Sequence, residues 1–206
     1  MTKQEKINIL KEYATTKANI YQALEKLDCR YGVEIGVREA GNLKHLAKNK
    51  NFNKGMLFGV DCWTENSDKP EINDVGFTQE ILDQQFLKCT IDFSLNPFVK
   101  IIRNFSYEAS FTFPDNYFDF IYIDAAHDYE SMVVDLNAWW PKLKPGGIFS
   151  GHDYIEYDVI WRGKKCEVYR AVNEFAVQNN VTVDYVEGNF EDPDPFSRCP
   201  SFFIIK

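Results

Sequence analysis

Residues 30–41 read RYGVEIGVREAG, and this stretch predicts a strand, a tight turn and the start of a helix. The run 31–35 is short and apolar, as in a buried strand, and Gly36 breaks it. Beyond Gly41 the apolar residues take a helical spacing. Backbone N–H groups in such a turn have no partners within the element, so they can be donated to a bound molecule. We therefore expect a ligand cradle, with glycine where the ligand lies against the backbone.

The rest of the chain alternates between short apolar runs and amphipathic patterns. Apolar runs typical of strands occupy 31–35, 56–60, 98–102, 118–123, 147–150, 181–186 and 201–205. Helical spacings occupy 3–27, 80–93, 131–140 and 168–177, and the PKLKPGG segment at 141–147 is expected to end the third of them. Apolar strands that alternate with helices predict an α/β fold with a mainly parallel sheet. The polar segment 63–78 is long enough to form a lid.

Composition narrows the class of protein. The length of 206 residues and the 45% hydrophobic content fit a single globular domain, with a helical extension at 1–28 and the main domain at 29–206. The formal charge of -8 and the absence of a basic run argue against nucleic acid as a partner. Five scattered cysteines without CxxC spacing argue against a disulfide framework or a zinc knuckle and favour the reducing cytoplasm. We expect no signal peptide and no membrane partner. The aromatic content of 16% leaves room for a homodimer.

Hydrogen-bonding residues follow nearly every predicted central strand, at the edge where ligands bind in such sheets. They are Glu34, Asp61, Asn104, Ser106, Asp124, His127, His152 and Asp153. A dinucleotide fingerprint needs GxGxxG, whereas Gly36 and Gly41 stand alone. Glu34 would repel a phosphate and suits an ammonium group, and Asp61 can accept hydrogen bonds from both hydroxyls of a ribose. These residues favour a nucleoside that carries an amino acid over NAD.

Four segments resemble the class I S-adenosylmethionine-dependent methyltransferases. They are VEIGVREAG at 33–41, GVDCW at 59–63, DFIYIDAAHDYESMVVDLNAWWPKLKPGGIFSGHDY at 119–154 and SFFIIK at 201–206. The resemblance covers residues 28–206 and is closest to the methyltransferase-24-like group, which includes sugar and macrolide O-methyltransferases. It implies a Rossmann-like three-layer α/β/α sandwich. The implied seven-stranded sheet has the strand order 3-2-1-4-5-7-6, with strand 7 antiparallel.

The same resemblance assigns the cofactor contacts. Glu34, Gly36 and Gly41 would line the methionine end of S-adenosylmethionine. Asp61 would hold the ribose, and Ser106 would lie near the adenine. Asp124 would close strand four opposite the positive sulfur. This chain departs from the family pattern four places after Gly36, where Ala40 replaces the usual glycine and Gly41 follows it.

Methyl transfer from a sulfonium needs an aligned acceptor and either a general base or a metal ion that lowers the pKa of the acceptor. O-methyltransferases that resemble this chain hold Mg²⁺ at positions that correspond to Asp124, His152 and Asp153. An imidazole is a less natural magnesium ligand, so His152 is also a candidate base. His127 is the other candidate, because an imidazole is expected to titrate near neutral pH. Asp124, His127 and His152 are therefore the candidate catalytic residues, with metal and base both open.

We expect a cytoplasmic S-adenosylmethionine-dependent O-methyltransferase acting on a small molecule, such as a sugar or another hydroxylated metabolite. An NAD-dependent oxidoreductase is the alternative enzyme. A non-catalytic cofactor-binding module of the same fold is the alternative outside enzymes. Aromatic residues in the flanking loops, Trp63, Tyr154, Tyr157 and Trp161, either stack on the acceptor or pack within their loops. The composition of those loops does not identify the acceptor.

Overall fold

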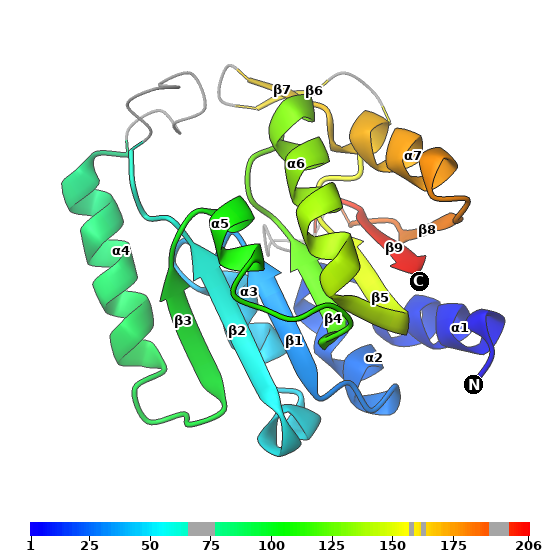
Figure 1. Cartoon of the computed structure of the whole chain (residues 1–206), viewed down its shortest axis with the longest axis horizontal. Helices are drawn as coiled ribbons and strands as arrows, with labels where there is room; N and C mark the ends of the chain where they lie inside the picture. The colour runs from blue at the N-terminus through cyan, green and yellow to red at the C-terminus, as the bar shows by residue number, and fades with distance from the viewer. Residues whose placement is uncertain (66–76, 157–158, 162–163, 190–197) are drawn as a thin grey trace.

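A computed structural model describes residues 1–65, 77–156, 159–161, 164–189 and 198–206. Its centre is a seven-stranded sheet with the order β3-β2-β1-β4-β5-β9-β8 (Figure 1). The strands are β1 (Tyr31–Ile35), β2 (Met56–Asp61), β3 (Val99–Arg103), β4 (Phe118–Ile123), β5 (Leu143–Gly151), β8 (Val183–Val186) and β9 (Ser201–Ile205). Strand β9 is antiparallel to β5 and β8, whereas β3, β2, β1, β4 and β5 are parallel to one another. Counted within the sheet, this is the order 3-2-1-4-5-7-6, so the predicted fold class and strand order are confirmed.

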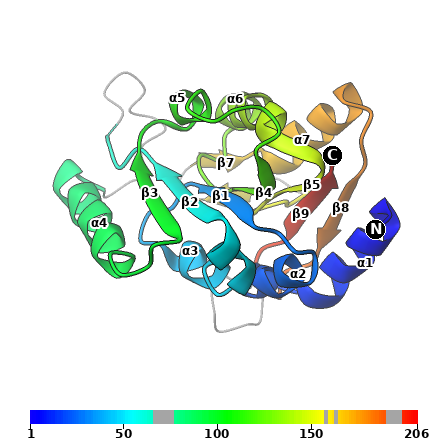
Figure 2. The ribbon, with the colours of Figure 1, turned by 60° about the horizontal axis from the view of Figure 1, so that its bottom comes forward.

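Helices cover both faces of the sheet. On one side lie α1 (Lys3–Tyr13), α2 (Ile20–Lys26), α3 (Gly41–Leu46) and, toward the β3 edge, α4 (Gln79–Asp92). On the other side lie α5 (Ser106–Ser110), α6 (Tyr129–Trp139) and α7 (Val168–Gln178). Figure 2 shows α5 and α6 on one side of the strands and α2 and α3 on the other. Short 3-10 turns occur at η1 (Lys17–Asn19), η2 (Lys50–Lys54) and η4 (Trp140–Lys142). In the described parts of the chain, no helix has the length and apolar character that a membrane crossing requires.

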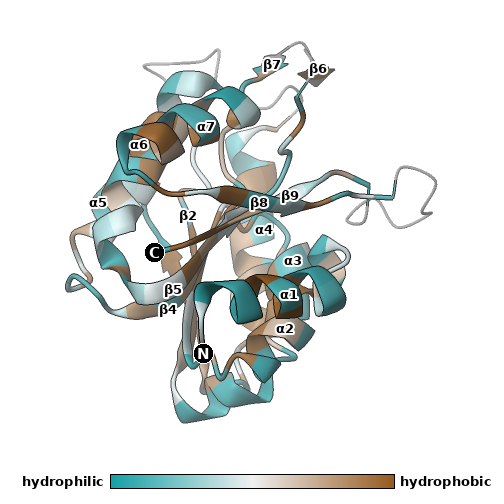
Figure 3. Ribbon diagram, turned by 90° about the vertical axis from the view of Figure 1, so that its right-hand side faces the viewer, coloured by the Kyte–Doolittle hydropathy of each residue, from teal (hydrophilic) through white to brown (hydrophobic). Residues whose placement is uncertain are grey.

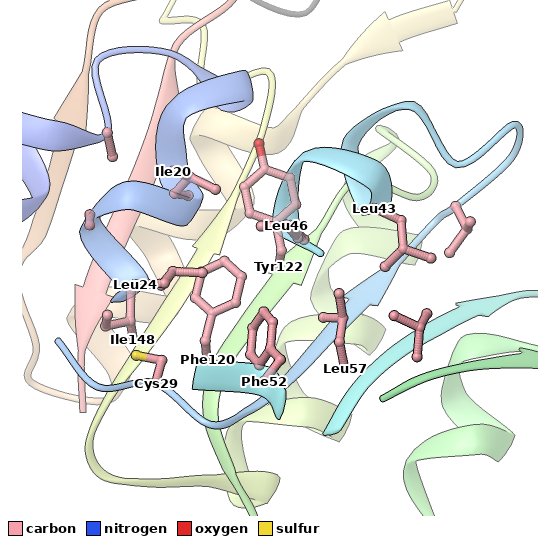
Figure 4. Packing of buried hydrophobic residues seen from close by; sticks show 14 of the residues in the cluster. Ile20, Leu24, Cys29, Leu43, Leu46, Phe52, Leu57, Phe120, Tyr122 and Ile148 are labelled. Carbon is pink, nitrogen blue, oxygen red and sulfur yellow. The ribbon is translucent and has the colours of Figure 1, made fainter. Parts of the chain in front are cut away.

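Alternation along the strands divides the core into two layers. In β4, Phe120 and Tyr122 belong to the cluster beneath α1–α3, whereas Ile121 and Ile123 belong to the cluster beneath α5–α7. Figure 4 shows Phe120 and Tyr122 among buried residues that include Leu24 of α2. In Figure 3 the strands are mostly apolar, and polar residues lie on the outer helices. Asp124 follows Phe120 and Tyr122 at the same two-residue spacing, so its side chain is expected on the α1–α3 side of the sheet.

The first two helices pack into the same core as α3. Thr2 caps α1 in a reciprocal capping box with Glu5, and the helix ends at Tyr13. Ala14 and Ile20 on either side of the following turn are fully buried. The η1 turn contacts α3. The break between α1 and α2 is thereby fixed against the sheet rather than left on the surface.

The structure differs from the sequence-based prediction in three places. Strand β5 begins at Leu143 and not at 147 as predicted, so the LKPGG segment, which was expected only to end the preceding helix, is part of the strand. Its pairing with β4 shifts register between Phe118 and Phe120, and Gly146 takes a left-handed φ of 77°. The five-residue helix α5 was not predicted. Strands β6 (Val159–Trp161) and β7 (Lys164–Cys166) form a hairpin within an expected loop. Most of the expected lid, 63–78, lies outside the described residues.

Candidate active site

Backbone hydrogen bonds hold the carboxyl ends of four adjacent strands together. The N–H of Gly36 donates to the carbonyl of Val60 at 2.9 Å, which ties the turn after β1 to β2. The N–H of Asp124 donates to the carbonyl of Ile35 at 2.8 Å. The N–H of His152 then donates to the carbonyl of Ile123 at 3.2 Å. The predicted site residues after β1, β4 and β5 are therefore neighbours at one edge of the sheet.

The turn after β1 requires Gly36 for a reason within the protein. Gly36 has a φ of 88°, and a Cβ built on it would lie 2.1 Å from the carbonyl oxygen of Asp124. Only glycine fits this approach of the turn to the end of β4. Within 37–41, Arg38 and Ala40 have left-handed φ values of 49° and 62°, whereas Gly41 does not. Ala40 thus keeps the backbone conformation that glycine adopts more readily.

Asp61 closes this turn with its carboxylate. Its Oδ2 accepts hydrogen bonds from the N–H groups of Val37 and Arg38, each at 2.9 Å. Its Oδ1 accepts a hydrogen bond from the N–H of Trp63 at 2.9 Å. The structure therefore gives Asp61 a role in shaping the turn, and the ribose contact implied by the sequence stays a prediction.

The hydroxyl of Ser106 is engaged with helix α6. It donates to Asp135 Oδ1 at 2.5 Å and accepts from Trp139 Nε1 at 2.9 Å. Burial raises the pKa of Asp135 to about 7, although the hydrogen bond from Ser106 acts in the opposite direction. Asp135 was not predicted as a site residue, because its position on α6 gives no local sign of a partner after β3. The adenine contact of Ser106 stays a prediction.

Glu34 is buried with one carboxylate oxygen unpaired. Its Oε1 accepts a hydrogen bond from Asn42 Nδ2 at 2.8 Å, and the side chain is 1% exposed. Its Oε2 has no hydrogen-bond partner among the described residues. Burial raises the pKa of Glu34 to about 8, while Lys17 and Asn42 act to lower it. A cationic ligand group beside Oε2 would favour the ionised carboxylate.

Lys17 reaches the site from the turn between α1 and α2. Its ammonium forms an ion pair with Asp124 Oδ2, and the two side chains are 6% and 15% exposed. Burial would lower the pKa of Lys17, but Asp124 and Glu34 together raise it, so the amine stays protonated. Lys17 was not predicted, because its only local sign is a polar break between two helical patterns. Such a break is more often found at the surface than in a site.

Asp153 lies between two imidazoles. Its Oδ2 is 2.9 Å from His127 Nε2, and its Oδ1 is 3.2 Å from His152 Nδ1. His127 Nε2 is also 3.7 Å from Asp124 Oδ1. Burial acts to lower the pKa of His127, but Asp124 and Asp153 raise it to about 10. His127 is therefore a cation at neutral pH, and the expected titration near neutrality is not found.

His152 faces Asp153 with the other ring nitrogen: Nδ1 in His152, but Nε2 in His127. Its Nδ1 faces Asp153, whereas its Nε2 is buried and has no hydrogen-bond partner within the described part of the chain. The residue as a whole is 8% exposed. An imidazole that is oriented by a carboxylate through one nitrogen is able to accept a proton at the other.

Hydrogen bonds and packing show which residues near the site have a structural role. Helix α6 is capped by Asp128, whose side chain accepts from the N–H of Ser131 at 2.9 Å, so Asp124 is not the cap. Trp63 is 1% exposed and packs on Phe86, and so does not offer a face to an acceptor.

Tyr154 is also a packing residue. Its ring lies 4.7 Å from that of Tyr169, and its hydroxyl bonds with Asn173. Tyr157 and the side chain of Trp161 lie outside the described residues. Of the four loop aromatics singled out in the sequence, Trp63 and Tyr154 are therefore packed within the protein.

The three predicted metal ligands come together, but their surroundings do not fit Mg²⁺. One ligand atom each from Asp124, His152 and Asp153 lies within 4.8 Å of the others. All four carboxylate oxygens of the two aspartates already face Lys17, His127 or His152. Magnesium prefers oxygen ligands in a near-ideal octahedron, whereas this set includes an imidazole and an adjacent ammonium group.

Comparisons with known proteins agree with this architecture. A family model described as a methyltransferase domain matches residues 31–154. The uncharacterized protein R132 of Acanthamoeba polyphaga mimivirus is 30% identical over 143 residues, which are 68% of this chain and 58% of the viral protein. The chain thus spans less than two thirds of the length of that curated relative.

Two solved structures are similar in fold. The O-methyltransferase from Bacillus cereus in complex with SAH aligns with a TM-score of 0.58 at 14% identity, over 100% of this chain and 82% of that chain. The O-methyltransferase NovP aligns with a TM-score of 0.64 at 14% identity, over 92% of this chain and 78% of that one. At this level of identity, the likeness concerns the fold.

Proposed function

Since the chain belongs to the methyltransferase-domain family that its residues 31–154 match, we propose that it methylates a hydroxyl oxygen of a small molecule with S-adenosylmethionine. The observation that carries the proposal is the buried acid Glu34, whose Oε2 has no partner among the described residues, two positions before the Gly36 turn at the carboxyl edge of the sheet. Carboxylates favour a cofactor that bears an ammonium group and a sulfonium. The SAH complex of the Bacillus cereus O-methyltransferase supports the same cofactor.

The residues after β1 and β2 would bind the cofactor. Glu34 Oε2 is a buried acceptor without a partner in the described residues, and it would accept a hydrogen bond from the amino group. Asp61 Oδ2 already accepts two hydrogen bonds, whereas Oδ1 accepts only one and would use its remaining lone pair to accept a hydrogen bond from the ribose. Gly36 and Gly41 would line the methionine end without side chains in the way. Ser106 would lie near the adenine while its hydroxyl keeps its hydrogen bonds to Asp135 and Trp139 of α6.

When bound, S-adenosylmethionine supplies an activated methyl group, which moves to the acceptor oxygen as the carbon–sulfur bond breaks and its electron pair stays on sulfur. The protein must then take the acceptor proton. His152 Nε2 would accept it, and Asp153 would orient the ring through Nδ1. His127, already protonated, would instead hold Asp153 and Asp124 in place. This division of roles between the two histidines follows from their different partners.

The acceptor and the compartment are part of the same proposal. The acceptor is a small hydroxylated molecule of the sugar, phenol or polyketide class. The cytoplasm suits five cysteines that are all free in the structure.

Calorimetric titration with S-adenosylhomocysteine tests the cofactor assignment. We expect saturable binding, and folded protein that gives no saturation would overturn the proposal. Stabilisation by NAD(H) in its place would favour an oxidoreductase. Transfer of a labelled methyl group to a panel of sugars, phenols and polyketides tests the reaction. Binding without transfer to any of them would favour a cofactor-binding module.

A further inference from the structure

We propose that Lys17 is a resident cation that takes the place of a divalent metal ion beside Asp124, so that the site works without Mg²⁺. In this proposal Lys17 is a positioning residue that neutralises and orients the Asp124 carboxylate. The inference deepens the proposed function by stating how the same site is activated. Its test measures metal binding without cofactor, so the two proposals can fail separately.

The first support is the occupation of the carboxylate oxygens. Asp124 Oδ2 is paired with Lys17 Nζ, and Asp124 Oδ1 lies 3.7 Å from His127 Nε2. The two oxygens of Asp153 face His127 and His152 at 2.9 and 3.2 Å. A metal ion could gain a carboxylate ligand here only by displacing a nitrogen from one of these oxygens.

The second support is the sign of the charge next to the candidate metal position. An ammonium in contact with Asp124 would lie within a few ångströms of any cation bound by the same carboxylate. Like charges at that separation repel strongly in a buried site, because water is not there to screen them. The negative charge of Asp124 is also no longer available to attract a second cation.

The third support is that Lys17 cannot move away without a large loss. The residue is 5% exposed, and its ammonium lies 6.0 Å from the centre of the Tyr122 ring. Ala14 and Ile20 anchor the segment on either side of it in the core. If the lysine swung out, Asp124 would be left as a buried carboxylate without its closest counter-charge.

This arrangement has a consequence for the reaction. A metal ion would polarise the acceptor oxygen and lower its pKa, whereas a lysine paired to an aspartate leaves proton removal to a protein base. The proton from the acceptor hydroxyl would pass to His152 Nε2 as the methyl group is transferred. Lys17 keeps the neighbouring carboxylate ionised and does not itself accept the proton.

The experiment is a calorimetric titration of the whole chain with Mn²⁺ and with Mg²⁺, in the absence of cofactor. We expect no saturable binding of either ion to the natural protein at millimolar concentration. In Lys17→Met, which keeps the length of the side chain but not its charge, we expect Mn²⁺ to bind at least about tenfold more tightly. Lys11→Met is the matched control, because Lys11 pairs with Asp184 at 2.8 Å on the surface, away from the site.

Three results would overturn the proposal. One is micromolar binding of Mg²⁺ to the natural protein. Another is a methyl-transfer rate that falls more than tenfold with EDTA and recovers with Mg²⁺. The third is the absence of any gain in Mn²⁺ binding in both Lys17→Met and Lys17→Gln. The second variant, with a neutral polar side chain, decides the outcome if the first does not fold.

Discussion

The ammonium of Lys17 and the carboxylate of Asp124 form an ion pair between residues separated by 107 positions in the sequence. The pair joins the turn between the first two helices to the end of β4, in the middle of the sheet. Burial would raise the pKa of Asp124, but Lys17 lowers it, so the carboxylate stays charged. The amino-terminal helices therefore contribute a side chain to the site as well as covering the sheet.

Breaking this pair from one side should destabilise the fold. We expect Lys17→Met to lower the free energy of unfolding by about 3 kcal/mol, because it leaves a buried carboxylate with less compensation. The double variant Lys17→Met with Asp124→Asn should recover part of that loss, since neither charge then remains. Urea unfolding at neutral pH measures both. Additive losses in the double variant would show that the two side chains do not interact.

Cofactor affinity should depend on pH through Glu34. Its pKa of about 8 in the ligand-free protein means that binding an ammonium group beside it would release a proton. The Kd for S-adenosylhomocysteine should therefore fall as pH rises from 6 to 8, by up to about tenfold per pH unit. Glu34→Gln should bind more weakly and without this slope. Titrations in buffers of different ionisation enthalpy count the released proton, and a pH-independent Kd would contradict the assignment.

Stability should fall with rising pH through Asp135. Its pKa of about 7 in the folded protein lies above the ordinary value of 3.8, so the folded state holds the proton more tightly than the unfolded state. This contribution is fully present below pH 4 and is lost as pH rises through 7. The difference in free energy of unfolding between Asp135→Asn and the natural protein should shift in favour of the variant by roughly 2–3 kcal/mol from pH 5 to pH 8. Asp115→Asn, at an exposed carboxylate, is the control and should show no such gain.

Gly36 should not tolerate even the smallest side chain. The Cβ of Gly36→Ala would lie 2.1 Å from a carbonyl oxygen, so we expect a loss of at least about 2 kcal/mol and weakened cofactor binding. Gly146→Ala is the matched control, because its φ of 77° is also left-handed but the nearest atom to a Cβ is the flexible Lys6 Nζ at 3.3 Å. That variant should lose only about 1–2 kcal/mol, the cost of the backbone conformation. Equal losses, measured by thermal unfolding, would mean that crowding at Gly36 is unimportant.

The two histidines should differ in their effect on the rate. Removing a general base lowers kcat by about 10²–10⁴, so His152→Ala should lose that much. His127→Asn removes a cation between two aspartates and should affect the rate less. The measurement is kcat at saturating cofactor and acceptor, with circular dichroism as the check on folding. A larger loss in His127→Asn would assign the base to the other ring.

The strands could be predicted well from the sequence because each is a short continuous apolar run. The ranges 31–35, 118–123 and 201–205 are the same in prediction and structure. The signal fails where backbone conformation is set by a distant partner. Residues 143–147 were predicted only to end the preceding helix, but the N–H of Gly146 donates to the carbonyl of Lys206 at 2.7 Å and the segment is part of strand β5.

The acidic residues of the candidate site could be predicted from the sequence, but most of the residues that pair with them could not. Strand ends bring Glu34, Asp124 and Asp153 to one edge by topology alone. The partners depend on side chains that meet only after folding, such as Lys17 at Asp124. The same holds for Ser106, whose hydroxyl bonds with Asp135 on α6. No local pattern in the sequence encodes these long-range pairs.

Lys17 lies in front of the segment 31–154 that carries the family match. Under the role proposed for Lys17, two chains that agree at every position of that segment could still differ in their need for a metal, because this residue is outside it. To predict the metal dependence of such a chain, one must also identify the residue that corresponds to Lys17, in the turn between the first two helices. A fragment trimmed to the matched boundaries would lack this lysine and would report on a differently charged site.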